Sequence, residues 1–250
     1  MLYAAAMIVR TQSNGVVTLT LDRPARRNAL DDAAMHTLAA ELATIGIDSA
    51  CRCVLIRGAG SSFSAGRDLK QAADLDREAA LAQHRRWADV FRGLRRLPCP
   101  SVAVVQGHAV AGGFTLALAC DFMIAERGAK FGALEMANGF PAAMCTPILA
   151  HKAPPAFGLE AALFGQPVEA ARLAEAGLIN RLVDTADDLD AAVDGFVGRI
   201  LELDPVAVRQ TVETYRAART MPLEQAFTMG EHLNQLIEAT GGFKRKGDPR

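Results

Sequence analysis

Two segments rich in small residues offer main-chain amides that could stabilise an anion. They are residues 55–69, LIRGAGSSFSAGRDL, and residues 104–121, VVQGHAVAGGFTLALACD. In each, a buried strand is expected to run into glycines and alanines, which let a ligand approach the backbone closely. The second segment continues into a helix, so the amide of Gly112 should lie at a helix N-terminus, where unpaired N–H groups favour negative charge. Two converging amides would form an oxyanion hole, although each segment alone is also explained by a tight turn.

Other common catalytic motifs are missing from the sequence. There is no GxGxxG, and residues 107–113 end in glycine where a phosphate-binding loop needs lysine. The serines of residues 60–64 do not form the GxSxG of a serine hydrolase. The five histidines are scattered without HExxH, and the five cysteines have no zinc-type spacing. The residues therefore predict anion stabilisation, as in acyl transfer or enolate chemistry, and no metal site.

The hydrophobic pattern places both segments in an α/β chain. Residues 8–12 and 16–22 alternate apolar and polar side chains around Asn14-Gly15, which predicts a β-hairpin. Asp31-Asp32 should open an amphipathic helix that runs to about residue 45, and a longer helix is expected over residues 77–97. Strands alternate with helices over the first 135 residues, and helices dominate the rest apart from an extended segment at 178–183. This order predicts an α/β core with a helical C-terminal part.

Composition excludes several classes of protein. The 250 residues contain 27 Lys plus Arg against 28 Asp plus Glu, for a net charge of −1, and 50% are hydrophobic. A near-neutral chain is not expected to bind nucleic acid. No apolar stretch reaches the ~18 residues of a membrane span, so we expect no membrane partner. An odd number of cysteines suits a reducing compartment, which predicts a cytoplasmic protein.

The order and spacing of five segments resemble the crotonase superfamily, the enoyl-CoA hydratase/isomerase family. The segments are residues 21–30 (LDRPARRNAL), 63–69 (FSAGRDL), 107–121 (GHAVAGGFTLALACD), 130–141 (KFGALEMANGFP) and 174–183 (AEAGLINRLV). The resemblance implies a crotonase-like spiral of ββα units over residues 1–190, which holds the acyl-CoA site, and a helical C-terminal trimerisation region over residues 191–250. It also implies an acyl-CoA thioester substrate, no separate cofactor, and assembly as a homotrimer or a dimer of trimers.

The same resemblance assigns roles to individual residues. The oxyanion donors should be the amides of Arg67 and Gly112, which act where enolisation places negative charge on the thioester oxygen. The residues implied to contact CoA are Arg26, Arg27, Ala65, Gly66, Asp68, Phe243 and Lys244. For the two arginines of the RPARRNAL turn, a solvated basic turn is an equally good interpretation.

The type of reaction depends on two positions. Hydratases of the family use two glutamates, and this chain has Glu135 at the second position but Thr115 at the first. Threonine cannot act as a base near neutral pH, whereas one glutamate can move a proton between carbons. Apolar neighbours such as Phe131 and Phe140 should raise the pKa of Glu135. We therefore expect an isomerase-like shift of a double bond, with two alternatives: a hydratase that uses Thr115 and an ordered water, or a non-catalytic acyl-CoA-binding homologue.

Overall fold

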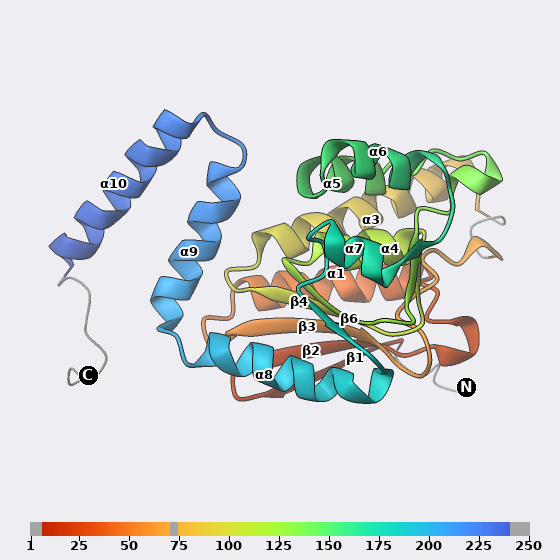
Figure 1. Ribbon diagram of the computed structural model, residues 1–250, viewed down its shortest axis with the longest axis horizontal. Coiled ribbons are helices and arrows are strands. Elements are labelled where there is room, and N and C mark those ends of the chain that lie inside the picture. Colours follow the sequence, from red (N-terminus) through yellow and green to blue (C-terminus); the bar gives the residue numbers. More distant parts are fainter. Residues whose placement is uncertain (1–6, 71–74, 241–250) are drawn as a thin grey trace. The chain divides into compact units, whose positions relative to one another are not determined.

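The computed structural model describes residues 7–70 and 75–240, and it is a mixed α/β structure (Figure 1). The chain divides into two compact units, Met1–Leu203 and Asp204–Arg250. The boundary expected after residue 190 falls inside helix α8 (Leu189–Leu201). The first unit extends past this point because Val193 and Val197 of α8 are buried in a cluster with residues of the central sheet.

The central sheet has six strands in the order β1-β2-β3-β4-β6-β9. Their bounds are β1 Ile8–Ser13, β2 Val16–Leu21, β3 Cys53–Gly58, β4 Ser101–Val105, β6 Phe122–Glu126 and β9 Arg181–Val183. The predicted hairpin is confirmed, since β1 and β2 are antiparallel and both turn residues, Asn14 and Gly15, have positive φ. The remaining neighbours are parallel, so β3, β4 and β6 end at the same edge of the sheet.

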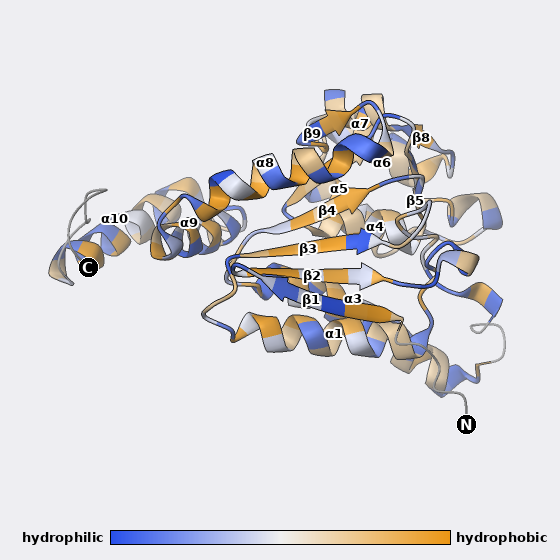
Figure 2. Cartoon of the chain, turned by 90° about the horizontal axis from the view of Figure 1, so that it is seen from below, coloured by the Kyte–Doolittle hydropathy of each residue, from blue (hydrophilic) through white to orange (hydrophobic). Residues whose placement is uncertain are grey.

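Helices cover both faces of this sheet, which is why its central strands are apolar on both sides (Figure 2). Val54 and Ile56 of β3 belong to the cluster that contains buried residues of helices α1, α3 and α4. Leu55, which alternates with them, belongs to the second cluster with Leu189 of α8. The strand period of two residues thus divides the core into two layers.

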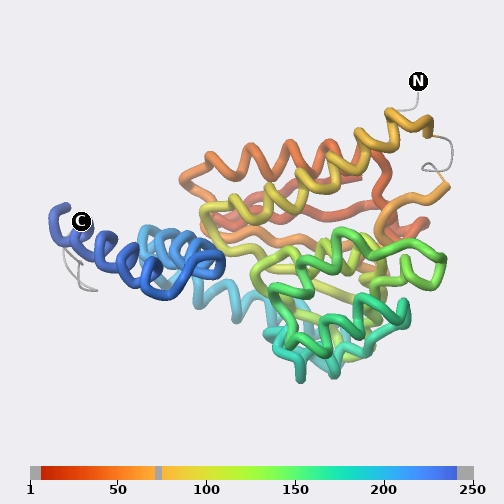
Figure 3. The backbone as a smooth tube through the Cα atoms, turned by 90° about the horizontal axis from the view of Figure 1, so that it is seen from above, coloured from red at the N-terminus to blue at the C-terminus, as the bar shows by residue number. Residues whose placement is uncertain are grey.

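Helices α1 (Asp32–Gly46) and α3 (Arg77–Arg96) run side by side on the first face (Figure 3). Both follow the predicted ranges closely because an aspartate caps each N-terminus. The carboxylate of Asp31 accepts the amide of Ala34 at 2.9 Å, and that of Asp76 accepts the amide of Ala79 at 2.8 Å. These caps fix where each helix begins.

A second sheet of three strands carries the glycine-rich segment. Its order is β5 (His108–Val110), β7 (Lys130–Gly132) and β8 (Val168–Glu169). The sequence pattern predicted β7 but neither β5 nor β8. The strand expected to run into helix α4 (Gly112–Ala119) is β4 of the central sheet, but β5 of the second sheet lies between them and leads into the helix.

The other elements of the first unit are short. They are the helices α5 Cys145–Lys152, α6 Pro155–Leu163 and α7 Ala170–Glu175, and the 3₁₀ turns η1 Pro24–Arg26, η2 Met136–Asn138 and η3 Ala186–Asp188. In the second unit, helices α9 (Pro205–Ala218) and α10 (Leu223–Ala239) contain no buried residue. Phe243 and Lys244, which the resemblance places at CoA, lie outside the described residues.

Candidate active site

The loop after β3 is held along the start of β5. The amide of Ser64 donates to the carbonyl of His108 at 2.9 Å, and the amide of Val110 donates to the carbonyl of Ser64 at 3.1 Å. The Ser64 hydroxyl accepts the amide of Gly66 at 3.0 Å. A short parallel bridge therefore joins the two segments that the sequence singled out.

The other side of this loop is tied to the turn after β2. The carbonyl of Gly66 accepts the amide of Leu30 at 2.7 Å, and the amide of Asp68 donates to the carbonyl of Leu30 at 2.9 Å. Successive backbone groups of an extended segment point to opposite sides, so the amide of Arg67 points away from Leu30. Along residues 64–68, Arg67 is the position whose amide has no acceptor among the described residues.

Gly66 brings this loop against the start of α4. Its φ is +83°, and a Cβ built on it would lie 2.6 Å from the amide nitrogen of Gly112. Only glycine fits such a contact and such a φ without strain. As the first residue of α4, Gly112 has no partner for its N–H within the helix. The unpaired amide of Gly112 therefore lies beside Gly66, the residue that precedes the unpaired amide of Arg67.

Ala111, immediately before Gly112, has an unusual backbone conformation. Its φ and ψ are 50° and −126°, values that a residue with a Cβ rarely adopts. The conformation is held because its amide donates to the carbonyl of Gly132 in β7 at 2.8 Å. Strain of this kind is concentrated at functional sites, and here it aims the first turn of α4.

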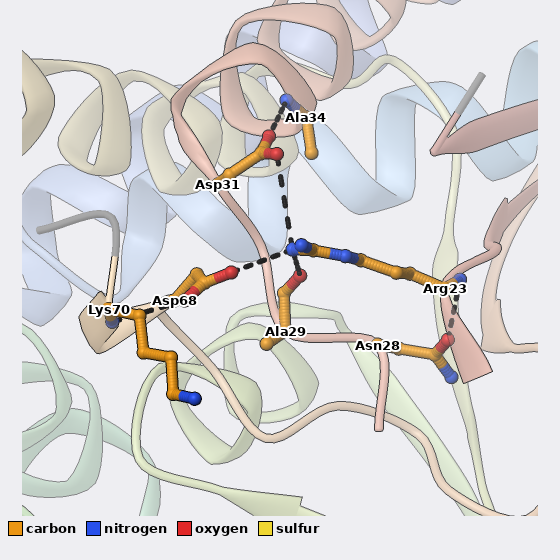
Figure 4. Close-up of polar contacts among 7 residues, drawn as sticks. All are labelled: Arg23, Asn28, Ala29, Asp31, Ala34, Asp68 and Lys70. Carbon is orange, nitrogen blue, oxygen red and sulfur yellow. Dashed lines mark hydrogen bonds and ion pairs between the residues drawn. The ribbon is translucent and has the colours of Figure 1, made fainter. Parts of the chain in front are cut away.

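An ion pair that the sequence did not predict joins the turn after β2 to the loop of residues 64–68 (Figure 4). The Arg23 Nη1 lies 2.7 Å from Oδ2 of Asp68 and 3.9 Å from Oδ2 of Asp31. Asn28, which is 1% exposed, accepts the amide of Arg23 at 2.9 Å and donates to the carbonyl of Ser62 at 2.7 Å. Both residues lie in the RPARRNAL turn, in which the sequence pointed only to Arg26 and Arg27.

Glu135 lies between β7 and the 3₁₀ turn η2 and is half-buried. Its Oε2 is buried without a hydrogen-bond partner in the described chain. Burial raises the pKa of this carboxyl above its usual range, as the sequence predicted. Of the two phenylalanines expected nearby, Phe131 is fully buried and Phe140 is 66% exposed.

Thr115 is buried behind the first turn of α4, with 1% of its surface exposed. Its hydroxyl donates to the carbonyl of Ala111 at 3.2 Å. Burial raises the pKa of the Cys145 thiol to about 12, a hydrogen bond with Thr115 opposes the rise, and the charge of Glu135 adds to it. These three side chains therefore lie in one electrostatic neighbourhood, and Cys145 stays a protonated thiol rather than a nucleophile.

The remaining expected CoA contacts lie around the same loop. Arg26 and Arg27 are exposed, and the carbonyl of Arg27 accepts the amide of Ala65 at 2.8 Å. The turn is thus bonded to the loop of residues 64–68, while Arg26 and Arg27 remain accessible to phosphates. The carboxylate of Asp68, in contrast, is paired with Arg23. This contact holds the loop in place and is not the CoA contact that the sequence led us to expect.

The described residues contain neither a metal cluster nor a membrane-spanning helix. Within residues 7–70 and 75–240, no cluster of three His, Cys, Asp or Glu side chains is arranged to hold a metal ion. No helix in the same ranges is long and apolar enough to cross a bilayer.

Comparison with known proteins decides the family. The family model described as enoyl-CoA hydratase/isomerase matches residues 11–247. The chain belongs to the enoyl-CoA hydratase/isomerase family. As a member of this family it is an acyl-CoA enzyme by descent, and its mixed α/β fold is the crotonase fold.

Individual relatives cover nearly the whole chain. It is 30% identical over 255 residues to carnitinyl-CoA dehydratase of Salmonella enteritidis, covering 96% of this chain and 95% of the relative. It is 28% identical to 2,3-dehydroadipyl-CoA hydratase of Escherichia coli, covering 93% and 91%. The crystal structure of an enoyl-CoA hydratase of Mycobacterium smegmatis superimposes with a TM-score of 0.86 at 29% identity, covering 94% of this chain and 95% of that one.

Proposed function

We propose that the protein shifts a double bond in an enoyl-CoA thioester through an enolate, with Glu135 as the one proton carrier. The observation that carries this proposal is the contrast between two side chains. Glu135 has a buried carboxylate oxygen without a partner and a raised pKa, as a general base needs. Thr115 has its hydroxyl bonded to the backbone of its own helix and shares a hydrogen bond with Cys145. The first carboxylate of a water-activating pair is absent.

The proposed reaction balances with this single group. The Glu135 carboxylate takes a proton from the α carbon of a 3-enoyl thioester, and the electron pair moves onto the thioester oxygen. The amides of Arg67 and Gly112 donate hydrogen bonds to that oxygen, where each donor lowers the barrier by about 3 kcal/mol. Glu135 then returns its proton to the γ carbon, which leaves the 2-enoyl thioester. No metal or redox cofactor takes part in this scheme.

Hydration is the second candidate, and the names of two relatives favour it. The two relatives described above are named a hydratase and a dehydratase. In this alternative Thr115 and an ordered water replace the missing glutamate. For Thr115 to serve, its hydroxyl would have to leave the carbonyl of Ala111.

The two reactions are separated by paired substrates. We expect the wild-type protein to convert 3-hexenoyl-CoA into 2-hexenoyl-CoA faster than it hydrates crotonyl-CoA, followed by chromatography of the thioesters. Hydration of crotonyl-CoA without isomerisation would overturn the isomerase assignment. If neither thioester reacts and Glu135→Gln changes nothing, the chain is a non-catalytic acyl-CoA-binding homologue.

The C-terminal helices carry the proposal for assembly. Their exposed apolar side chains are Val206, Tyr215, Leu223, Phe227 and Leu236. A helix pair with no buried residue is not stable through its own packing, so it needs a partner surface. We propose that other copies of the chain supply it in a homotrimer or a dimer of trimers.

A further inference from the structure

Gln83 is the one described residue whose side-chain amide is buried with both polar atoms unpaired. It is 0% exposed, and neither Nε2 nor Oε1 has a hydrogen-bond partner. A buried polar group without a partner destabilises the native state, and native proteins leave few of them. Gln106, the other glutamine with an orphan atom, at least donates to two carbonyls. Gln83 therefore lacks an acceptor for Nε2 and a donor for Oε1, and one group that both donates and accepts would supply them.

Gln83 lies on a buried face of α3, the helix that packs against the start of α4. Trp87 lies four residues later and so on the same face of the helix. The ring edge of Trp87 would be 2.9 Å from a Cβ built on Gly112. Since four residues rise about 6 Å along a helix, Gln83 lies about one turn of α3 from Trp87, the side chain that meets Gly112.

A salt bridge fixes this turn of α3 against the same loops. Arg86 donates from Nε and Nη2 to the two carboxylate oxygens of Asp32, at 2.7 Å each. Asp32 starts α1 two residues after Leu30, which is bonded to Gly66. The turn that contains Gln83 is therefore anchored next to the segment that carries the Arg67 amide.

Two of the other orphaned polar atoms belong to residues of the proposed site. Five buried side-chain atoms have no partner, and they belong to Arg67, Gln83, Gln106 and Glu135. Arg67 and Glu135 are the residues of the proposed oxyanion hole and proton carrier. Buried polar groups without a partner in the protein indicate a polar ligand that completes them.

We propose that Gln83 determines specificity by binding a hydroxyl group on the acyl chain of the thioester, an inference that rests on the proposed acyl-CoA function. A hydroxyl accepts from Nε2 and donates to Oε1, which satisfies both atoms at once. A carboxylate only accepts, so it would leave Oε1 unpaired, and an alkyl chain would leave both atoms unpaired. The favoured ligand class is a hydroxyacyl-CoA with the hydroxyl beyond the reacting carbons.

Equilibrium binding of saturated thioesters tests the proposal without any turnover. We would titrate hexanoyl-CoA, its 4-, 5- and 6-hydroxy derivatives and adipoyl-CoA into the wild type, Gln83→Met and the exposed-face control His84→Leu by calorimetry. We expect one hydroxy derivative to bind the wild type at least about tenfold more tightly than hexanoyl-CoA. Gln83→Met should remove this preference, and His84→Leu should keep it.

Three outcomes would overturn the proposal. Equal affinity of wild type for all thioesters, or an equal loss for all of them in Gln83→Met, would show that the partner of Gln83 is an internal water. Tightest binding of adipoyl-CoA would show an anionic ligand instead. Turnover of 3-hexenoyl-CoA is measured in parallel, so a protein that is inactive but prefers the hydroxy derivative would refute the proposed function and leave the Gln83 site standing.

Discussion

The guanidinium of Arg23 contacts the carboxylate of Asp68 at 2.7 Å and thereby joins the turn after β2 to the loop that carries the Arg67 amide. The side chains are 30% and 12% exposed, so the pair is partly shielded from water. The contact lies one residue from a backbone donor of the proposed oxyanion hole. We infer that this pair positions the donor rather than contacting substrate.

Breaking this pair should lower turnover more than binding. We expect Arg23→Gln to reduce kcat about tenfold with little change in KM, because the Arg67 amide loses its fixed direction. In a double-mutant cycle with Asp68→Asn, the coupling free energy of unfolding should be about 1 kcal/mol. Rescue of kcat by Arg23→Lys would support positioning, and equal losses in kcat for Arg10→Gln, a surface ion-pair control, would contradict it.

Adding one carbon at Gly66 should close the proposed oxyanion hole. A Cβ there would lie 2.6 Å from the Gly112 nitrogen, so we expect Gly66→Ala to reduce kcat at least about 100-fold. Gly177→Ala is the matched control, since Gly177 has a similar φ of +75° but nothing within 4 Å of the added carbon. Steady-state kinetics and thermal unfolding of both variants separate the local clash from backbone strain.

Removing the charge of Glu135 should abolish catalysis and spare binding. We expect Glu135→Gln to lower kcat about 10²–10⁴-fold, the usual contribution of a general base, with an unchanged Kd for a saturated acyl-CoA. Glu175→Gln, on the exposed surface of α7, should leave both quantities unchanged. A Glu135→Gln protein with wild-type turnover would rule out the proposed mechanism.

The raised pKa of Glu135 predicts the pH dependence of both rate and stability. The base must be ionised, so kcat/KM should fall as pH drops through a pKa above 4.5. A carboxyl whose pKa is raised by folding binds more protons in the native state, so its ionisation destabilises the protein as pH rises. Glu135→Gln should therefore be more stable than wild type at pH 7, and the difference should vanish below pH 4, as measured by urea denaturation at each pH.

The apolar side chains of α10 should control assembly. We expect Phe227→Asp, at a position that is 62% exposed, to dissociate the oligomer into smaller species in sedimentation velocity. Gln225→Asp, at a neighbouring exposed position, adds the same charge and should leave the assembly intact. A wild-type protein that sediments as a monomer would contradict the proposed trimer.

The sequence alone determined much of the fold and the family. Aspartates at helix starts, an Asn-Gly turn and alternating apolar residues are local features, and they correctly placed α1, α3 and the β1–β2 hairpin. The order of motifs was sufficient to recognise the family, and the glycine-rich segments pointed to anion stabilisation. The raised pKa of Glu135 was also predicted from its apolar neighbours in the sequence.

Only the tertiary structure decided which of these residues meet. The Arg23–Asp68 pair spans 45 positions of the chain, and the contact of Gly66 with Gly112 spans a similar length, so no local pattern reports them. Likewise, a buried glutamine on an amphipathic helix looks like any surface residue in sequence, and its missing partner becomes evident only when every neighbour is in place. Periodicity indicates which side of an element is buried, whereas only the packing shows which residues cover that side.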